Sequence, residues 1–239
     1  MKRFVYILYT ALIATPIWVI ITILVSLIVV IAAFFGETRW ISYWFPKLWS
    51  KSACLLYLID VKVEGKENLD KKQSYIFLAN HQGYFDIFLI YGYLGWPFKW
   101  MMKEYLRKLP FVGYACLKSK QIYVGESRAS IAHAVRMAEE TLTDGMSMTI
   151  FPEGTRTPDG KLGPFKRGAF MLANDINLPI VPITINGSYD ILSRTATWVH
   201  SGKLTMTIHK PITPADREGM ASKAVMQQVW DTINSGLKE

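Results

Sequence analysis

The sequence predicts an α/β fold, in which a largely parallel sheet is flanked by helices and preceded by an N-terminal membrane-embedded helical segment. The first observation is that residues 4–35 contain no Asp, Glu, Lys, Arg or His. The second is that short apolar runs alternate with helical patterns beyond residue 60, as they do in domains built on a parallel sheet. We therefore expect a membrane-embedded or interfacial segment at residues 1–59 and an α/β domain at residues 60–239.

The apolar run is too long for a secretory signal, whose apolar region spans roughly 7–15 residues. As one straight helix it would extend roughly 48 Å, against about 30 Å of hydrocarbon in a bilayer. We therefore expect the helix to tilt, bend or double back, with Pro16 as the point at which it kinks. The next residues, 40–59, are rich in aromatic side chains and predict interfacial structure.

Cations flank the apolar run on both sides, and each group predicts that its own end faces the cytoplasm. Lys2 and Arg3 precede the run, and Arg39, Lys47 and Lys51 follow it. A single crossing satisfies only one group, whereas a helical pair that enters the bilayer and returns satisfies both. We prefer the helical pair, which places the α/β domain at the cytoplasmic face; a one-pass anchor is the alternative.

The composition also favours a membrane. The chain has a formal net charge of +8, with 51% hydrophobic and 19% charged residues. This charge suits nucleic acid, anionic lipid or a phosphorylated substrate. The eight tryptophans favour the membrane surface, because aromatic and basic side chains gather there. We expect no nucleic-acid partner, since no recognition helix or RNA-binding motif accompanies the charge.

Five segments of the α/β domain have the pattern of strands. Residues 60–65 alternate between apolar and polar side chains, and residues 74–80 form a short continuous apolar run typical of a buried strand. The other strand segments are residues 146–151, 178–185 and 203–210.

Four segments predict helices. Residues 86–94 are expected to start a helix, with Asp86 at or near its N-cap. Thr213 and Pro214 suit the cap and first turn of a closing helix. The four helical segments are residues 86–94, 127–145, 166–177 and 213–237.

His81 and Asp86 are five positions apart, just after an apolar strand. On one helix their side chains would point about 140° apart, so the chain must turn between them to bring them together. Gly83 allows such a turn, and a carboxylate beside an imidazole orients a general base. A histidine that lies near a carboxylate by chance is the alternative. Because no GxSxG motif supplies a serine nucleophile, the nucleophile would belong to the substrate.

A second polar stretch follows the strand at residues 146–151. Four cations lie within about a dozen positions, with glycines between them: Arg156, Lys161, Lys166 and Arg167. Guanidinium groups bind phosphate with two parallel hydrogen bonds, and glycines let backbone N–H groups approach an anion. The pattern predicts a phosphate site, with a solvated basic loop as the equally weighted alternative.

Other polar residues have no assigned role, among them His133, His200 and His209. Residues 98–111 interleave cations with aromatic and apolar side chains. These cations are Lys99, Lys103, Arg107 and Lys108. They predict either a solvated face or a basic surface that contacts a membrane.

The two polar stretches together resemble the glycerolipid acyltransferases. "NHQGYFD" matches their NHxxxxD motif, "FPEGTR" matches their third motif without a change, and "LPIVPITI" is similar to their fourth, apolar motif. The resemblance covers roughly residues 60–212 and is strongest to the 1-acyl-sn-glycerol-3-phosphate acyltransferase family. It implies a glycerol-3-phosphate acyltransferase-like fold and an O-acyltransferase.

The resemblance implies roles for the residues already singled out. His81 would take the proton from the acceptor hydroxyl, and Asp86 would hold the imidazole in the productive tautomer. The hydroxyl would attack the thioester of an acyl carrier protein or coenzyme A, with no acyl-enzyme. The implied acceptor site comprises Glu153, Gly154, Thr155 and Arg156, with Arg156 on the phosphate and Lys166 beside it.

The resemblance implies no metal and no cofactor besides the acyl thioester. The two cysteines, Cys54 and Cys116, have no metal-type spacing and predict no disulfide framework. The remaining partners are the bilayer and its lipid acceptor, which the membrane segment would bring to an active site at the cytoplasmic face.

One motif departs from the family pattern. The second motif of the family usually ends in an arginine, but residues 122–128, "IYVGESR", place Glu126 there. Arg128, two positions later, is expected to replace it. The departure leaves the acceptor open between lysophosphatidic acid and another lysolipid, an aminolipid or a glycan. A non-catalytic module that binds anionic lipid is a remote alternative.

Overall fold

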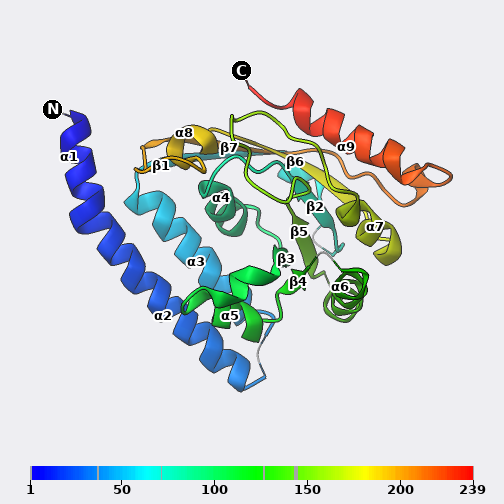
Figure 1. The fold of residues 1–239 in the computed structure, drawn as a ribbon, viewed down its shortest axis with the longest axis horizontal. Coiled ribbons are helices and arrows are strands. Elements are labelled where there is room, and N and C mark those ends of the chain that lie inside the picture. Colours follow the sequence, from blue (N-terminus) through cyan, green and yellow to red (C-terminus); the bar gives the residue numbers. More distant parts are fainter. Residues whose placement is uncertain (1, 37, 71, 126, 143–144, 239) are drawn as a thin grey trace.

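The structure is a computed structural model that describes residues 2–36, 38–70, 72–125, 127–142 and 145–238. The described residues form a seven-stranded sheet with helices on both faces (Figure 1). The strands are β1 (Ile59–Glu64), β2 (Ile76–Ala79), β3 (Phe98–Lys103), β4 (Ile122–Val124), β5 (Ser147–Ile150), β6 (Ile180–Asn186) and β7 (Gly202–Ile208). Their order in the sheet is β1-β7-β6-β2-β5-β3-β4.

The sheet is parallel except where β6 meets β7. The α/β fold with a largely parallel sheet is therefore confirmed. β2 lies between β5 and β6, with Leu78 opposite Ile150 on one side and Pro182 on the other. Because β2 and β5 are parallel, the residues that follow both strands emerge at the same edge of the sheet.

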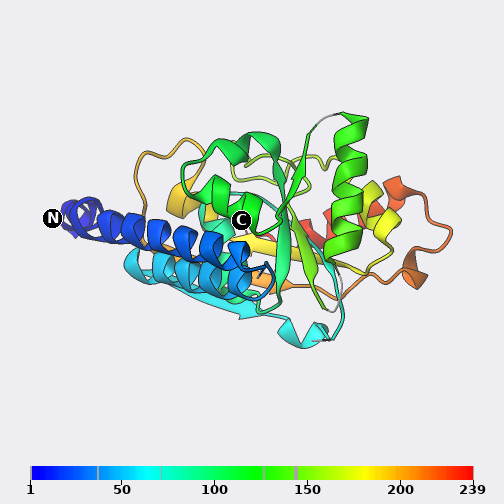
Figure 2. The ribbon, with the colours of Figure 1, turned by 90° about the horizontal axis from the view of Figure 1, so that it is seen from below.

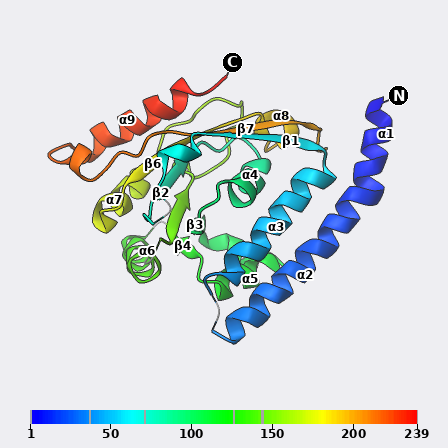
Figure 3. The same cartoon turned by 180° about the vertical axis from the view of Figure 1, so that it is seen from behind.

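Helices cover both faces of the sheet (Figures 1 and 3). The α-helices are α1 (Lys2–Tyr9), α2 (Thr15–Phe34), α3 (Ile41–Leu56), α4 (Phe85–Tyr93), α5 (Val112–Lys118), α6 (Arg128–Thr141), α7 (Arg167–Ile176), α8 (Ser188–Leu192) and α9 (Ser222–Ser235). Short 3-10 helices span Lys66–Asn68, Glu104–Lys108 and Ala215–Arg217, and a π-helical turn spans Thr10–Ala14.

Alternation along the central strands builds a core on each face of the sheet. Phe77 and Ala79 of β2 join the core under α3 and α4. Ile76 and Leu78 point the other way, into the core under α6, α7 and α9. Successive side chains of a strand alternate between faces, so a strand buried on both faces must be apolar throughout, as β2 is.

The apolar run does not double back on itself. α1, the π-helical turn and α2 form one rod, and α3 returns beside it (Figure 2). The Tyr6 hydroxyl donates to the Tyr57 carbonyl, and Trp49 Nε1 donates to the Thr22 hydroxyl, so the two helices are antiparallel. Pro16 lies in the first turn of α2, directly after the π-helical turn, where its missing N–H interrupts the regular ladder.

The rod has the composition of a membrane helix. The stretch Arg3–Phe34 is long and apolar enough to cross a bilayer, and only 17% of its most apolar part is buried within the protein. A helix in a soluble core would bury most of that surface. The exposed apolar surface therefore supports membrane association of the N-terminal segment.

The five predicted strands correspond to β1, β2, β5, β6 and β7, whereas β3, β4, α5 and α8 were not predicted. β3 was not predicted because the cations of residues 98–111 were interpreted as a surface feature. Lys99 was grouped with the exposed cations, but it is 2% exposed. Its ammonium donates to the Thr38 and Ser119 carbonyls and to the Ser42 hydroxyl.

The expected start of the closing helix was wrong. α9 begins at Ser222, not at Thr213. Asp216 accepts hydrogen bonds from the Thr213 backbone N–H and hydroxyl, which closes a tight turn before a short 3-10 helix. Gly219 then adopts a φ of +74°, which a continuous right-handed helix does not allow.

Candidate active site

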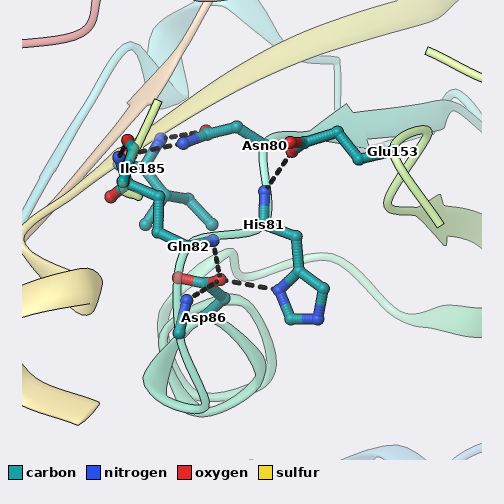
Figure 4. Close-up of polar contacts among 8 residues, drawn as sticks. Asn80, His81, Gln82, Asp86, Glu153 and Ile185 are labelled. Atoms are coloured by element: carbon teal, nitrogen blue, oxygen red, sulfur yellow. Dashed lines mark hydrogen bonds and ion pairs between the residues drawn. The ribbon is translucent and has the colours of Figure 1, made fainter. Parts of the chain in front are cut away.

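The histidine and the aspartate of the first polar stretch meet at the end of β2. His81 follows the strand, and Asp86 lies in the first turn of α4. His81 Nδ1 is 2.7 Å from Asp86 Oδ2 (Figure 4). The Asp86 side chain is fully buried, and the His81 side chain is 13% exposed. The structure therefore brings the two predicted residues together.

Asp86 Oδ2 also accepts the backbone N–H groups of Gln82 and Gly83, at 2.7 and 2.9 Å. These donors and the N-terminus of α4 stabilise a carboxylate at this position. A carboxylate only accepts hydrogen bonds, so the imidazole proton lies on Nδ1. The lone pair of His81 then lies on Nε2, the ring nitrogen directed away from Asp86.

Gly83 is required for space. A Cβ atom at this position would lie 2.4 Å from the Ser188 carbonyl oxygen and 2.7 Å from that of Leu192. The Tyr84 N–H donates to the same Leu192 carbonyl. The turn between His81 and Asp86 therefore packs directly on α8, a helix that the sequence did not reveal.

Three contacts fix the backbone and the ring of His81. The Asn80 side chain exchanges two hydrogen bonds with the backbone of Ile185 on β6 (Figure 4). The His81 carbonyl accepts the N–H of Thr157. The imidazole stacks on Phe151, with ring centroids 3.8 Å apart and planes 7° from parallel. These contacts hold the imidazole in one orientation.

Glu153 joins the two polar stretches. Oε1 accepts the His81 N–H at 2.7 Å, and Oε2 accepts the Gly163 N–H at 2.9 Å. Burial raises the pKa of this carboxyl to about 7; the two N–H donors oppose the shift, and the nearby Asp86 adds to it. Both carboxyl oxygens of Glu153 thus accept hydrogen bonds from backbone N–H groups. This geometry suits Glu153 to hold the His81 segment in position.

The buried carboxyl predicts a pH dependence of stability. Between pH 4.5 and about 7 the folded chain holds more protons on Glu153 than the unfolded chain does. The free energy of unfolding therefore falls as the pH rises through this window and levels off above it. We expect the thermal midpoint of the wild-type protein to fall relative to that of Glu153→Gln, whose amide does not titrate. Parallel pH profiles for the two proteins would contradict the assignment.

The remaining third-motif residues lie around this carboxyl. Gly154 has a φ of +69°, and a Cβ atom there would lie 3.0 Å from Lys166 Cε. The Lys166 side chain therefore runs over Gly154, while Thr155 is exposed. The Arg156 guanidinium lies 3.5 Å from the ring centroid of Tyr84. Its Nη1 is buried and has no hydrogen-bond partner among the described residues.

The second motif lies at the edge of the sheet, two strands from β5. Arg128 is the first residue of α6, and the structure describes its backbone only. Glu126 lies outside the described residues. The geometry therefore brings together the first and third motifs, and the proposed substitution of Arg128 for the usual arginine stays a prediction.

One contact of the site comes from a residue that no motif indicated. Trp230 of α9 donates from Nε1 to the Gly163 carbonyl at 3.1 Å. Gly163 in turn donates to Glu153, which binds His81. A chain of hydrogen bonds thus connects the C-terminal helix to the histidine segment. Trp230 lies 67 positions from Gly163, and no local sequence pattern reports such a pairing.

Changing Trp230 to Phe keeps the ring in α9 and removes this hydrogen bond. A hydrogen bond of this kind contributes about 0.5–1.5 kcal/mol net. Because Arg156 and Lys166 flank the 157–165 loop, we expect the Kd for a phosphate-bearing ligand to rise roughly 2–10-fold. A binding titration would measure this, with the half-exposed Trp198→Phe as control. Equal Kd values for both variants would contradict the role.

The described residues contain no group of three or more His, Cys, Asp and Glu side chains that would hold a metal ion.

Comparison with known proteins identifies the family. Residues 60–186, more than half of the chain, match the family model described as Acyltransferase. The chain belongs to this acyltransferase family. The match spans both motifs that form the site, from β1 to the end of β6, the strand that binds Asn80.

Named relatives agree with the predicted resemblance. A chloroplastic 1-acyl-sn-glycerol-3-phosphate acyltransferase of Brassica napus is 31% identical over 173 residues, covering 71% of this chain and 50% of the relative. A 1-acyl-sn-glycerol-3-phosphate acyltransferase of Pseudomonas aeruginosa is 34% identical over 175 residues, covering 71% and 64%. The chain spans about half the length of the chloroplast relatives.

A solved structure confirms the fold of the chain. The crystal structure of the 1-acyl-sn-glycerophosphate (LPA) acyltransferase PlsC from Thermotoga maritima superposes with a TM-score of 0.80 and 29% sequence identity. The superposition covers 98% of this chain and 94% of that chain. The N-terminal helices are therefore part of the shared fold.

Proposed function

We propose that the protein transfers a fatty acyl group from an acyl thioester to the sn-2 hydroxyl of 1-acylglycerol-3-phosphate, which gives phosphatidic acid. The observation that carries the proposal is the buried contact of 2.7 Å between His81 Nδ1 and Asp86 Oδ2. It leaves Nε2 of a fixed imidazole as a base at the edge of the sheet. The named relatives support the acceptor.

In the proposed reaction, His81 Nε2 takes the proton of the acceptor hydroxyl as the oxygen attacks the thioester carbonyl. The new ester C–O bond forms, the C–S bond breaks, and the imidazolium returns its proton to the leaving thiolate. General-base assistance of this kind contributes about 10²–10⁴-fold to the rate. Asp86 stabilises the imidazolium, and no acyl-enzyme is formed.

The third motif is proposed to bind the acceptor phosphate. Arg156 presents a buried, unpartnered Nη1 among the described residues, and stacking on Tyr84 holds its guanidinium in place. Lys166 adds a flexible cation over Gly154. Charge-assisted hydrogen bonds to phosphate are about twice as strong as neutral ones. Arg128 is proposed as a further contact in place of the usual second-motif arginine.

The N-terminal helices are proposed to hold the domain at the cytoplasmic face of the bilayer, where the lipid acceptor resides. The helical pair that supports this proposal is formed by the rod and α3, because α3 returns the chain to the end at which it began, although Arg39 lies in the turn at the other end. Cysteine labelling from each side of the membrane tests this. Opposite exposure of residues near Lys2 and Lys51 would contradict it.

An acceptor panel tests the proposed reaction. Purified protein receives acyl-carrier-protein or coenzyme A thioester with lysophosphatidic acid, lysophosphatidylcholine, lysophosphatidylethanolamine or an aminolipid. We expect phosphatidic acid as the main product, with one of the two donors preferred. Transfer only to another acceptor would overturn the proposed substrate and favour the alternative that Glu126 raised. That alternative retains the same histidine mechanism.

A further inference from the structure

The segment between β3 and β4 exposes a cluster of apolar side chains. The 3-10 helix Glu104–Lys108 packs closely against α5 at Gly113. A Cβ atom at Gly113 would lie within 2.7 Å of the Arg107 and Leu106 carbonyl oxygens, so only glycine fits there. We call the outer surface of this pair the 104–118 patch. Its exposed apolar members are Tyr105, Leu109, Phe111, Tyr114 and Leu117, which are 43–62% exposed.

Cations surround these side chains. Lys108, Lys118 and the adjacent Lys120 are exposed. Arg107 is paired with Glu104 at 2.9 Å, so that acidic side chain is neutralised. Lys118 lies 5.3 Å from the ring centroid of Tyr114. Aromatic rings beside lysines are typical of surfaces that enter the headgroup region of a bilayer, with the rings in the interface and the ammonium groups at phosphate level.

The backbone holds one of these aromatic residues outward against its preference. Phe111 has a φ of +57°, a left-handed value that bulky residues avoid, and its side chain is 52% exposed. Strained residues that persist tend to serve a function. In this conformation the Phe111 ring lies on the exposed surface of the patch.

The patch is continuous with the apolar N-terminal rod. α5 packs against α2. The buried Lys99 ammonium donates hydrogen bonds to the Ser119 carbonyl at the end of α5 and to the Thr38 carbonyl in the turn between α2 and α3. It also donates to the Ser42 hydroxyl in the first turn of α3. The turn between α2 and α3 follows Phe34 and Phe35, which are 86% and 81% exposed. The patch and the end of α2 therefore lie side by side (Figures 1 and 2).

We propose that the 104–118 patch is a second lipid-contact surface, which enters the interface of an anionic bilayer beside the N-terminal helices. The occupant is lipid because the patch is basic, aromatic and continuous with the exposed apolar surface of the N-terminal rod. The proposal rests on the lipid-facing role assigned to the rod. It adds a contact from the α/β domain itself, which fixes how that domain is seated on the membrane.

Depth-dependent quenching tests the proposal. The chain is reconstituted into phosphatidylcholine vesicles with or without phosphatidylglycerol, and some lipids carry a nitroxide on the acyl chain. A fluorophore is attached at Tyr114→Cys, in a protein with Cys54 and Cys116 changed to Ala. The positive control is Ile20→Cys, near the middle of the N-terminal rod, where Ile20 is 57% exposed. The negative control is Met220→Cys, 37% exposed, in the loop before α9 at the opposite end of the molecule (Figure 1).

We expect the probe at residue 114 to be quenched at least twofold more than the probe at residue 220, and more so with phosphatidylglycerol. Lys118→Gln together with Lys120→Gln should remove the gain from phosphatidylglycerol. Equal quenching at residues 114 and 220, with strong quenching at residue 20, would overturn the proposal. Quenching does not depend on acyl transfer, so the readout stands apart from the proposed reaction.

Discussion

Replacing Asp86 by Ala is expected to lower kcat for acyl transfer by about 10²–10⁴-fold, the range that general-base assistance contributes. The change removes the carboxylate that orients His81 Nδ1 and stabilises the imidazolium. It also leaves the N–H groups of Gln82 and Gly83 without their acceptor. Each buried orphan donor costs about 1–3 kcal/mol, so the thermal midpoint should fall as well.

Asp86→Asn separates these two effects. Its amide oxygen still accepts the backbone N–H groups, so we expect a thermal midpoint closer to that of the wild-type protein. The amide carries no charge, so most of the loss in kcat should remain. Asp175→Ala, at an exposed aspartate of α7, is the matched control and should change neither quantity. An Asp86→Ala variant that retains more than a tenth of the wild-type kcat would contradict the proposed role.

Replacing Arg156 by Ala is expected to raise the KM for lysophosphatidic acid by roughly 10–100-fold, because a hydrogen bond to a charged group contributes about 1.5–3 kcal/mol. The effect should shrink for an acceptor without a phosphate monoester. Arg156→Lys should recover only part of the loss, since an ammonium neither forms two parallel hydrogen bonds nor stacks flat on Tyr84.

Lys223→Ala, at an exposed position in the first turn of α9, provides the charge-matched control. It removes one positive charge, as Arg156→Ala does, and tests whether net charge alone changes acceptor binding. If both variants raised KM equally, or if Arg156→Ala left it unchanged, the assignment of Arg156 to the phosphate would be wrong.

The sequence predicted the part of the site that depends on local pattern. The five-residue spacing of His81 and Asp86 required a turn, and apolar runs before both motifs placed them at strand ends. Parallel pairing of β2 with β5 then brought His81 and Glu153 to one edge. The turn itself depends on the close packing of Gly83 against α8, which local sequence does not encode.

The features that the sequence did not predict have physical explanations. β3 was not predicted because it contains Lys99, a charged residue that is buried where three distant oxygens accept hydrogen bonds from its ammonium group. Trp230 reaches Gly163 across 67 positions, and Glu153 reaches His81 across 72. Such contacts arise only from the folded topology. A periodic pattern predicts which face of a helix or strand is buried, but it does not predict which distant polar group contacts that face.

The central claim is that His81 activates the acceptor hydroxyl for direct attack on the thioester. The most direct measurement is single-turnover formation of phosphatidic acid by wild-type protein and His81→Ala, with lysophosphatidic acid and the acyl thioester both saturating. The account predicts a rate at least 10²-fold lower in the variant, with unchanged folding and no acylated protein in either sample. An undiminished rate in His81→Ala, or a covalent acyl-enzyme in the wild-type protein, would contradict it.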